Sequence, residues 1–168
     1  MNRRKRPLHP PMKDIQKLSK SMTYAVHGIL QCLHTERNLR IHTTAAVYVT
    51  ALALMAQLSR IELAVLCLCY ACMMCAEMLN TAVEYLLERD GGGFDSFVRD
   101  AKDIAAGAVF IVAVFCTVIG ALFFVNETAI GNIMAFVTAH VWVLVVFAVS
   151  VPIAVGYIFG YFGIGRIK

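Results

Sequence analysis

The chain has 168 residues, of which 60% are hydrophobic and only 15% are charged, and its mean hydropathy is +0.71. Soluble domains are about 45–50% apolar and about 25% charged, so this composition excludes an ordinary water-soluble domain. It also excludes a disordered chain and a secreted disulfide scaffold. The length fits one domain, and the composition predicts a small, all-α, polytopic membrane protein.

The chain begins with a basic tail, residues 1–11, and an amphipathic helix is predicted over residues 12–35. Apolar residues recur there at steps of three and four, which places them on one stripe of a helix. Such a helix lies in the cytoplasmic headgroup layer or packs on the spanning helices, and the pattern allows both. No apolar segment follows the basic start as in a signal peptide, so no cleavage is expected. The stripe consists of Ile15, Leu18, Met22, Val26, Ile29 and Leu33.

Long stretches without charged residues predict the spanning helices, because about 20 apolar residues cross the hydrocarbon core of a bilayer, and one further span is apolar only in its first half, from Leu63 to Ala76. The expected spans are about 41–59, 61–88 and 101–125, with one extra C-terminal transmembrane segment in 126–168, where Pro152 predicts a kink. Gly91–Gly93 is interpreted as a flexible turn. Lys and Arg concentrate before residue 41, in the loop 89–102 and in the tail, which predicts that both termini and this loop are cytoplasmic.

The second span carries polar groups in its cytoplasmic half, and these carry the strongest functional signal. At 100° per residue, Glu84 and Glu88 each return to within about 20° of Glu77, and Asn80 lies about 60° away. A carboxylate in a spanning helix is costly and points to a function. Glu77 is the deepest and could act as a general base. For Glu88, a solvated helix end is an equally good explanation.

Three carboxylates on one stripe repel one another unless a positive charge lies beside them. Mg²⁺ is one candidate, because it is usually held by one or two carboxylates together with substrate phosphates. The side chains of Lys102, Arg37 and Arg40 are the protein's own candidates.

Two further polar clusters are predicted at the same membrane depth. One is the segment Glu36–His42, where Glu36 and Arg40 are four residues apart and could form an ordinary helical ion pair. The other is the segment Asp100–Asp103, where Asp100 could be the N-cap of the third span. Each cluster alone is weak evidence for a functional site. The evidence is stronger because all three clusters are predicted at the same membrane depth.

These segments resemble the prokaryotic diacylglycerol kinase and undecaprenol kinase family. The similarity covers roughly residues 15–125 and rests on the segments Ala25–Gly28, Glu36–His42, Ala76–Glu84 and Ala101–Val109. It implies an integral membrane lipid kinase of the bacterial inner membrane, with three spans, Mg²⁺ as cofactor and ATP as co-substrate. It also implies a homotrimer that shares active sites between subunits, with no nucleic-acid partner.

Carried over by position, the resemblance implies a role for each matching residue. Glu77 would be the base that takes the proton of the lipid hydroxyl, and Glu36 and Glu84 would hold magnesium. Gly28, Arg40 and Glu88 would contact substrate or support the site. The nucleotide would be bound by Tyr24, Glu36, Asn80, Glu84, Lys102 and Asp103.

Several alternatives stay open at the level of sequence. The segment Glu36–His42 favours undecaprenol as the lipid, with diacylglycerol as the alternative. A non-enzymatic cation-binding or scaffolding membrane protein is the rival class, although the outer half of the second span is apolar, unlike an ion pathway. The extra C-terminal segment departs from the family pattern, and its role is open. His140 within it is interpreted as a packed or interfacial histidine.

Overall fold

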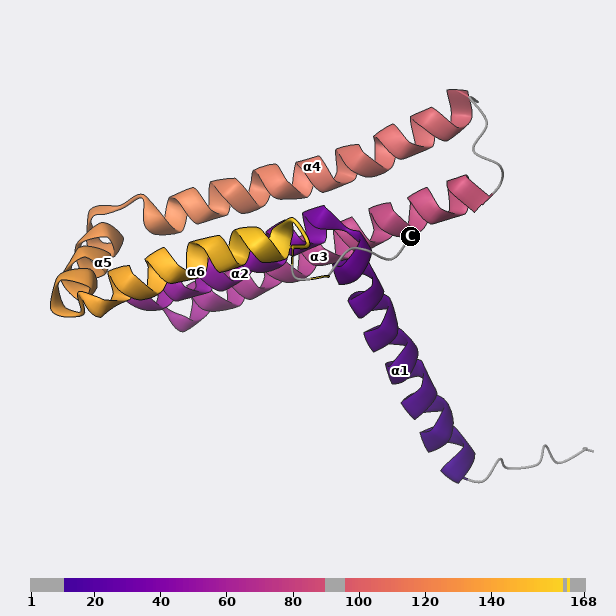
Figure 1. Cartoon of the computed structure of the whole chain (residues 1–168), viewed down its shortest axis with the longest axis horizontal. Helices are drawn as coiled ribbons and strands as arrows, with labels where there is room; N and C mark the ends of the chain where they lie inside the picture. The colour runs from indigo at the N-terminus through magenta and orange to yellow at the C-terminus, as the bar shows by residue number, and fades with distance from the viewer. Residues whose placement is uncertain (1–10, 90–95, 162, 164–168) are drawn as a thin grey trace, which may run out of the picture.

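The computed structural model describes residues 11–89, 96–161 and 163, and these form α-helices without a strand (Figure 1). Residues 1–10, Gly91–Gly93 and the basic residues of the C-terminal tail lie outside the described residues, so the predictions made for them are not addressed. The helices are α1 (Pro11–Thr35), α2 (Arg37–Met55), α3 (Arg60–Arg89), α4 (Ser96–Phe124), α5 (Glu127–Ala139) and α6 (Trp142–Ile158).

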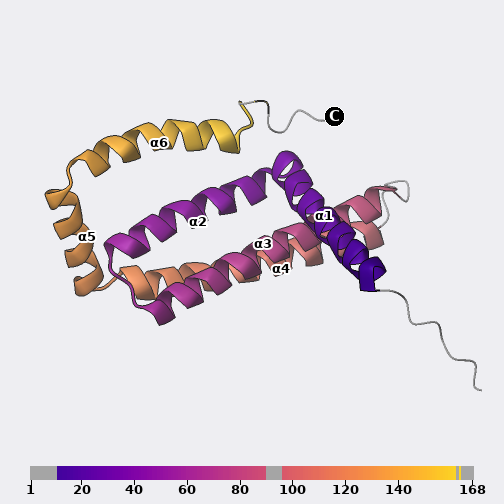
Figure 2. The ribbon, with the colours of Figure 1, turned by 90° about the horizontal axis from the view of Figure 1, so that it is seen from below.

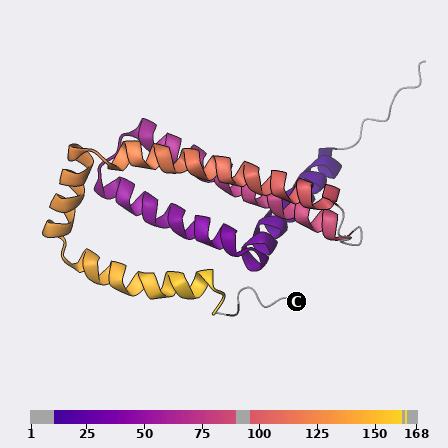
Figure 3. The same cartoon turned by 90° about the horizontal axis from the view of Figure 1, so that it is seen from above.

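Helices α3 and α4 form a long antiparallel pair, and α2 packs beside α3 (Figures 2 and 3). By length and composition, α3 and α4 can each cross a membrane, and α5 with α6 could form a third, broken span. Helix α2 is shorter and has Arg37, Arg40 and His42 in its first two turns, which makes it less apolar. The structure is therefore that of an all-α membrane protein, as predicted.

The turn between α2 and α3 explains why the first predicted span ends earlier than residue 59. Helix α2 ends at Met55, and Gln57 follows with a φ of 55°. Ser59 and Glu62 then form a reciprocal capping box, in which the Ser59 amide donates to Glu62 Oε2 at 2.7 Å and the Glu62 amide to Ser59 Oγ at 3.4 Å. These hydrogen bonds fix the start of α3.

The interpretation of Asp100 as an N-cap is wrong, because α4 already begins at Ser96 and Asp100 lies inside the helix. No proline or glycine stands between Ser96 and Asp103 to delay the helix. The side chain of Asp100 is exposed and lies 3.9 Å from Arg99 Nε.

The C-terminal extension consists of two helices that meet at an angle of 100°, so it is not one straight spanning helix. Asn126 caps α5 by accepting from the Ala129 amide at 2.8 Å. The sharp bend lies at His140 and Val141, whereas Pro152, where a kink was expected, is inside α6. His140 stacks on Phe136 with ring centroids 4.6 Å apart and is exposed, so it is not packed in a core, and an interfacial position stays a prediction.

Helix α1 is confirmed as a helix and projects from the bundle at an angle, touching α2 and α3 (Figure 1). Its large apolar side chains are exposed, among them Ile15, Leu18 and Met22. A position in the headgroup layer would cover this face, and that position stays a prediction.

Candidate active site

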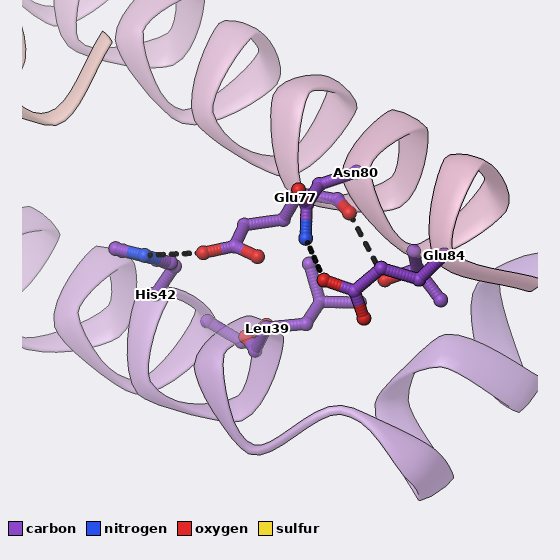
Figure 4. A network of polar contacts seen from close by, with 7 residues as sticks. Leu39, His42, Glu77, Asn80 and Glu84 are labelled. Atoms are coloured by element: carbon purple, nitrogen blue, oxygen red, sulfur yellow. Dashed lines mark hydrogen bonds and ion pairs between the residues drawn. The ribbon is translucent and has the colours of Figure 1, made fainter. Parts of the chain in front are cut away.

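The deepest polar group is the carboxylate of Glu77, which is 4% exposed and points from α3 toward α2 (Figure 4). His42, in the second turn of α2, places its Nε2 atom 3.2 Å from Glu77 Oε1. One turn further along α3, Thr81 Oγ1 donates to the Glu77 backbone carbonyl at 3.0 Å. The contact between His42 and Glu77 joins two helices at the predicted base.

Asn80 and Glu84 form the next layer of the same stripe. Asn80 Nδ2 donates to Glu84 Oε1 at 2.8 Å, which leaves the amide oxygen of Asn80 on the other side (Figure 4). This Oδ1 atom is buried and has no hydrogen-bond partner among the described residues. A buried acceptor of this kind can receive a donor or coordinate a cation.

Glu36 is brought to the same place by the junction of α1 and α2, where it is the N-cap residue of α2. Its backbone is extended, and its side chain makes no capping hydrogen bond. Tyr85, the residue after Glu84, donates to Oγ1 of Thr35, the residue before Glu36, at 3.3 Å, so the helix ends that carry these two carboxylates meet. The sequence placed them on two separate elements, and the packing of α2 on α3 unites them.

The fit of this group to Mg²⁺ follows from its donor chemistry. Among the described residues, no three His, Cys, Asp or Glu side chains surround one point where an ion could be held. The available oxygens are the carboxylates of Glu36 and Glu84 and the free Oδ1 of Asn80. Such a set suits a magnesium ion that arrives on nucleotide phosphates, because Mg²⁺ usually combines one or two carboxylates with phosphate oxygens.

At the cytoplasmic end of α3, Glu88 pairs with a lysine of α4. Lys102 Nζ lies 3.2 Å from Glu88 Oε1, and the Glu88 side chain is 63% exposed. This contact supplies one of the protein cations expected beside the acidic stripe. Asp103 is exposed on α4, next to Lys102.

Tyr24 and Gly28 lie one turn apart on α1, away from the contact between His42 and Glu77. Tyr24 is exposed, and a Cβ atom added at Gly28 would meet nothing within 4 Å. The described residues therefore give no steric reason for a glycine here. The predicted nucleotide role of Tyr24 remains a prediction.

Arg40 is buried and does not form the ion pair with Glu36 that its spacing allowed. Its guanidinium donates instead to three backbone carbonyl oxygens: from Nη1 to Leu33 at 3.1 Å and His34 at 2.9 Å, and from Nε to Ile158 at 3.0 Å. The spacing of four residues between Glu36 and Arg40 did not predict the partners of Arg40, because the helix ends that surround its guanidinium offer better acceptors.

An apolar cavity of about 280 Å³ lies between α2, α3 and α4. His42 is one of its lining residues and is also the residue that contacts Glu77. The other lining residues are mostly small or apolar and include Ala45, Leu66, Met73, Ala113 and Gly120.

His42 is the site residue that sequence reasoning did not place. A histidine near the start of an apolar helix, at the depth of a carboxylate on another span, was the available signal. Which face of α2 would turn toward Glu77 was not determined by the sequence.

Comparison with known proteins shows to which protein family this chain belongs. The model of the prokaryotic diacylglycerol kinase family matches residues 23–124, which include about half of α1 and all of α2, α3 and α4. This chain belongs to the prokaryotic diacylglycerol kinase family. No solved structure matches it.

Two curated relatives in this family carry different names. The undecaprenol kinase of Bacillus subtilis is 35% identical over 114 residues, which are 68% of this chain and 93% of that protein. The diacylglycerol kinase of Synechocystis is 38% identical over 101 residues, which are 60% of this chain and 58% of that protein. The chain thus spans little more than half the length of the second relative. Helices α5 and α6 lie beyond the part that matches the family.

Proposed function

We propose that this member of the prokaryotic diacylglycerol kinase family transfers the γ-phosphoryl group of ATP to undecaprenol, forming undecaprenyl phosphate and ADP. The observation that carries the proposal is the buried Glu77 carboxylate, which contacts His42, a lining residue of the apolar cavity, and lies on the same helix face as Asn80 and Glu84. A buried acid next to an apolar compartment suits a substrate with one hydroxyl and a hydrocarbon body.

The chemistry begins at Glu77. Its carboxylate accepts the proton of the lipid hydroxyl, and the oxygen attacks the γ-phosphorus as the bond between the β- and γ-phosphates breaks. Phosphoryl transfer depends mainly on positioning and on neutralising charge. His42 holds one carboxylate oxygen of Glu77, which orients the other toward the hydroxyl. The apolar cavity holds the first part of the hydrocarbon chain.

The nucleotide is proposed to lie on the cytoplasmic side of Glu77. Glu36 and Glu84 would hold Mg²⁺, which when bound would neutralise phosphate charge. Lys102 exchanges its exposed partner Glu88 for a phosphate oxygen, and Asp103 and Tyr24 support the nucleotide. The basic residues before residue 41 and around Arg99 and Lys102 support a cytoplasmic position for this end.

Undecaprenol is favoured over diacylglycerol for two reasons. The segment Glu36–His42 looks more like the undecaprenol kinase branch, and the undecaprenol kinase of B. subtilis is matched over nearly its whole length. Diacylglycerol remains the alternative, because the second relative carries that name.

The test is a radiolabelled ATP assay on purified full-length protein in lipid nanodiscs, with undecaprenol and diacylglycerol compared at equal mole fractions, each with and without Mg²⁺. Magnesium-dependent labelling of undecaprenol that exceeds that of diacylglycerol is expected. Preferential labelling of diacylglycerol would overturn the choice of lipid. Labelling of neither by folded protein would overturn the kinase proposal and favour ion binding or scaffolding.

A homotrimer with shared active sites is part of the proposal. It is supported by the family resemblance. Cross-linking in native-like membranes, followed by denaturing electrophoresis, should give a ladder that ends at three copies.

A further inference from the structure

We infer that the C-terminal extension, α5 and α6, positions the active site through Arg40. This guanidinium joins the end of α6 to the junction between α1 and α2. The inference rests on the proposed function, because the site it positions is the proposed kinase site. It concerns helices that lie outside the part matched by the family.

Helix α6 runs beside α2 (Figures 2 and 3), and the extension contacts α2 at three places. At the far end, Asn132 Nδ2 of α5 donates to the Ala56 carbonyl at 2.9 Å. In the middle, Tyr48 donates to Ser150 Oγ at 3.0 Å, and its ring meets that of Phe147 edge to face. At the end near the site, Arg40 bonds to Ile158.

The end of α6 leaves one carbonyl for Arg40. The Gly160 amide donates to the Tyr157 carbonyl at 3.2 Å, and the Tyr161 amide to the Gly156 carbonyl at 2.9 Å. With Gly160 at a φ of 73°, these two bonds form a Schellman motif. That motif satisfies Gly156 and Tyr157 and leaves the carbonyl of Ile158, the last helical residue, to accept from Arg40.

The end of α1 presents the same situation. The helix stops before Glu36, whose amide still donates to the Cys32 carbonyl at 2.8 Å. The next two carbonyls, of Leu33 and His34, receive Arg40 Nη1. Arg40 thus binds carbonyls at the C-terminal ends of two helices, where the partial charge is negative. This explains how an arginine can be buried without a carboxylate partner.

The consequence for the site follows from the short distance along α2. Arg40 lies two residues before His42, which holds Glu77, and four residues after Glu36. The backbone that presents both groups is therefore fixed by a side chain that is itself anchored on α6. Loosening α6 should let this first turn of α2 move, and small displacements at a reacting centre reduce turnover strongly.

The decisive variant is Phe147→Ala/Ser150→Ala, which removes the two contacts with Tyr48 and changes no site residue. The milder Tyr48→Phe removes only the hydroxyl and serves if the double variant does not fold. The matched control is Val146→Ala/Ile153→Ala on the same helix, where both side chains are more than half exposed. A fourth variant, Arg40→Lys, keeps the charge but loses the planar fork that reaches two helices.

Two readouts are measured on the full chain in nanodiscs. The first is kcat with the KM values for ATP and lipid. The second is the alkylation rate of Cys32 by N-ethylmaleimide, located by peptide mass spectrometry. Cys32 is half-buried in the last turn of α1, beside the carbonyls that Arg40 binds, so its alkylation reports on the junction without any need for activity.

We expect the decisive variant and Arg40→Lys to lower kcat about 10-fold while KM for ATP changes less than about 2-fold, because positioning acts on the transition state. Cys32 should be alkylated several-fold faster in both, and the control should match the wild type. Normal kcat and normal Cys32 alkylation in the decisive variant would overturn the inference. This holds even if Arg40→Lys changes both quantities, because the effect would then not pass through α6. If the wild type labels no lipid, the proposed function fails and Cys32 alkylation still decides this inference.

Discussion

His42 Nε2 lies 3.2 Å from Glu77 Oε1, and this contact joins the first turns of α2 to the middle of α3. Both groups lie where α2 and α3 pack together, and Glu77 is almost fully buried. The pair fixes the direction in which the second carboxylate oxygen of Glu77 points. The surroundings of this carboxylate are therefore set in part by a residue of another helix.

Replacing Glu77 by Gln should abolish lipid phosphorylation while leaving the fold and nucleotide binding intact. Loss of a general base typically costs about 10²–10⁴-fold in rate, and an amide of the same shape cannot accept the proton. The measurement is kcat in the radiolabelled assay, with nucleotide affinity determined separately. Glu127→Gln, at an exposed carboxylate beyond the site, is the control. Full activity in the Glu77 variant would exclude its role as the base.

Replacing His42 by Leu should lower both kcat and stability, whereas Gln should preserve most of each. Leucine leaves a buried carboxylate oxygen without its donor, and an unsatisfied buried polar group costs about 1–3 kcal/mol. Glutamine can still donate toward Glu77. The measurements are kcat and the thermal unfolding midpoint in detergent. Equal behaviour of the two variants would show that the hydrogen bond between His42 and Glu77 does not matter.

Replacing Glu84 by Gln should shift the magnesium dependence of the reaction to higher concentration. The amide keeps the contact with Asn80 but removes one of the two charges available to the ion. The measurement is the initial rate against free Mg²⁺ at saturating ATP. A magnesium curve that coincides with the wild-type curve would count against a ligand role for Glu84.

Variants of Lys102 and of Glu88 should differ in their effect on ATP binding, although neither should change stability much. Because both side chains are partly exposed, Glu88→Gln should change the free energy of unfolding by less than about 1 kcal/mol. Lys102→Gln should raise KM for ATP several-fold, because its charge would be needed by the phosphates. The experiment compares both variants in the same assay and in thermal unfolding. An unchanged KM in the Lys102 variant would exclude its phosphate contact.

Cys32 should react slowly with alkylating agents at neutral pH. Burial, and secondarily the negative charge of Glu36, raises the pKa of this thiol above its usual value. The reactive thiolate is therefore scarce at pH 7, and its fraction should grow as the pH rises toward the raised pKa. Glu36→Gln removes only the smaller cause, so it should speed alkylation modestly. A rate that does not increase between pH 7 and pH 9 would contradict this assignment.

Much of the fold was determined by local patterns. The stripe of apolar residues predicted α1 almost to the residue, a charge-free stretch located α4, and the apolar half from Leu63 to Ala76 located α3, because helices in lipid must satisfy their backbone internally. The rotation of 100° per residue was enough to place Glu77, Asn80 and Glu84 on one face of α3. These features depend on one helix at a time.

The contacts between different helices could not be predicted from these local patterns. The partner of Glu77, the partners of Arg40 and the bend at His140 each depend on how two or three helices pack. The spacing of Glu36 and Arg40 suggested an ion pair, but Arg40 instead reaches carbonyls of Leu33, His34 and Ile158. A helical period fixes the angular position of a side chain on its own axis. Only tertiary packing decides which groups from other helices meet it, because that choice depends on crossing angles and helix ends that no single segment encodes.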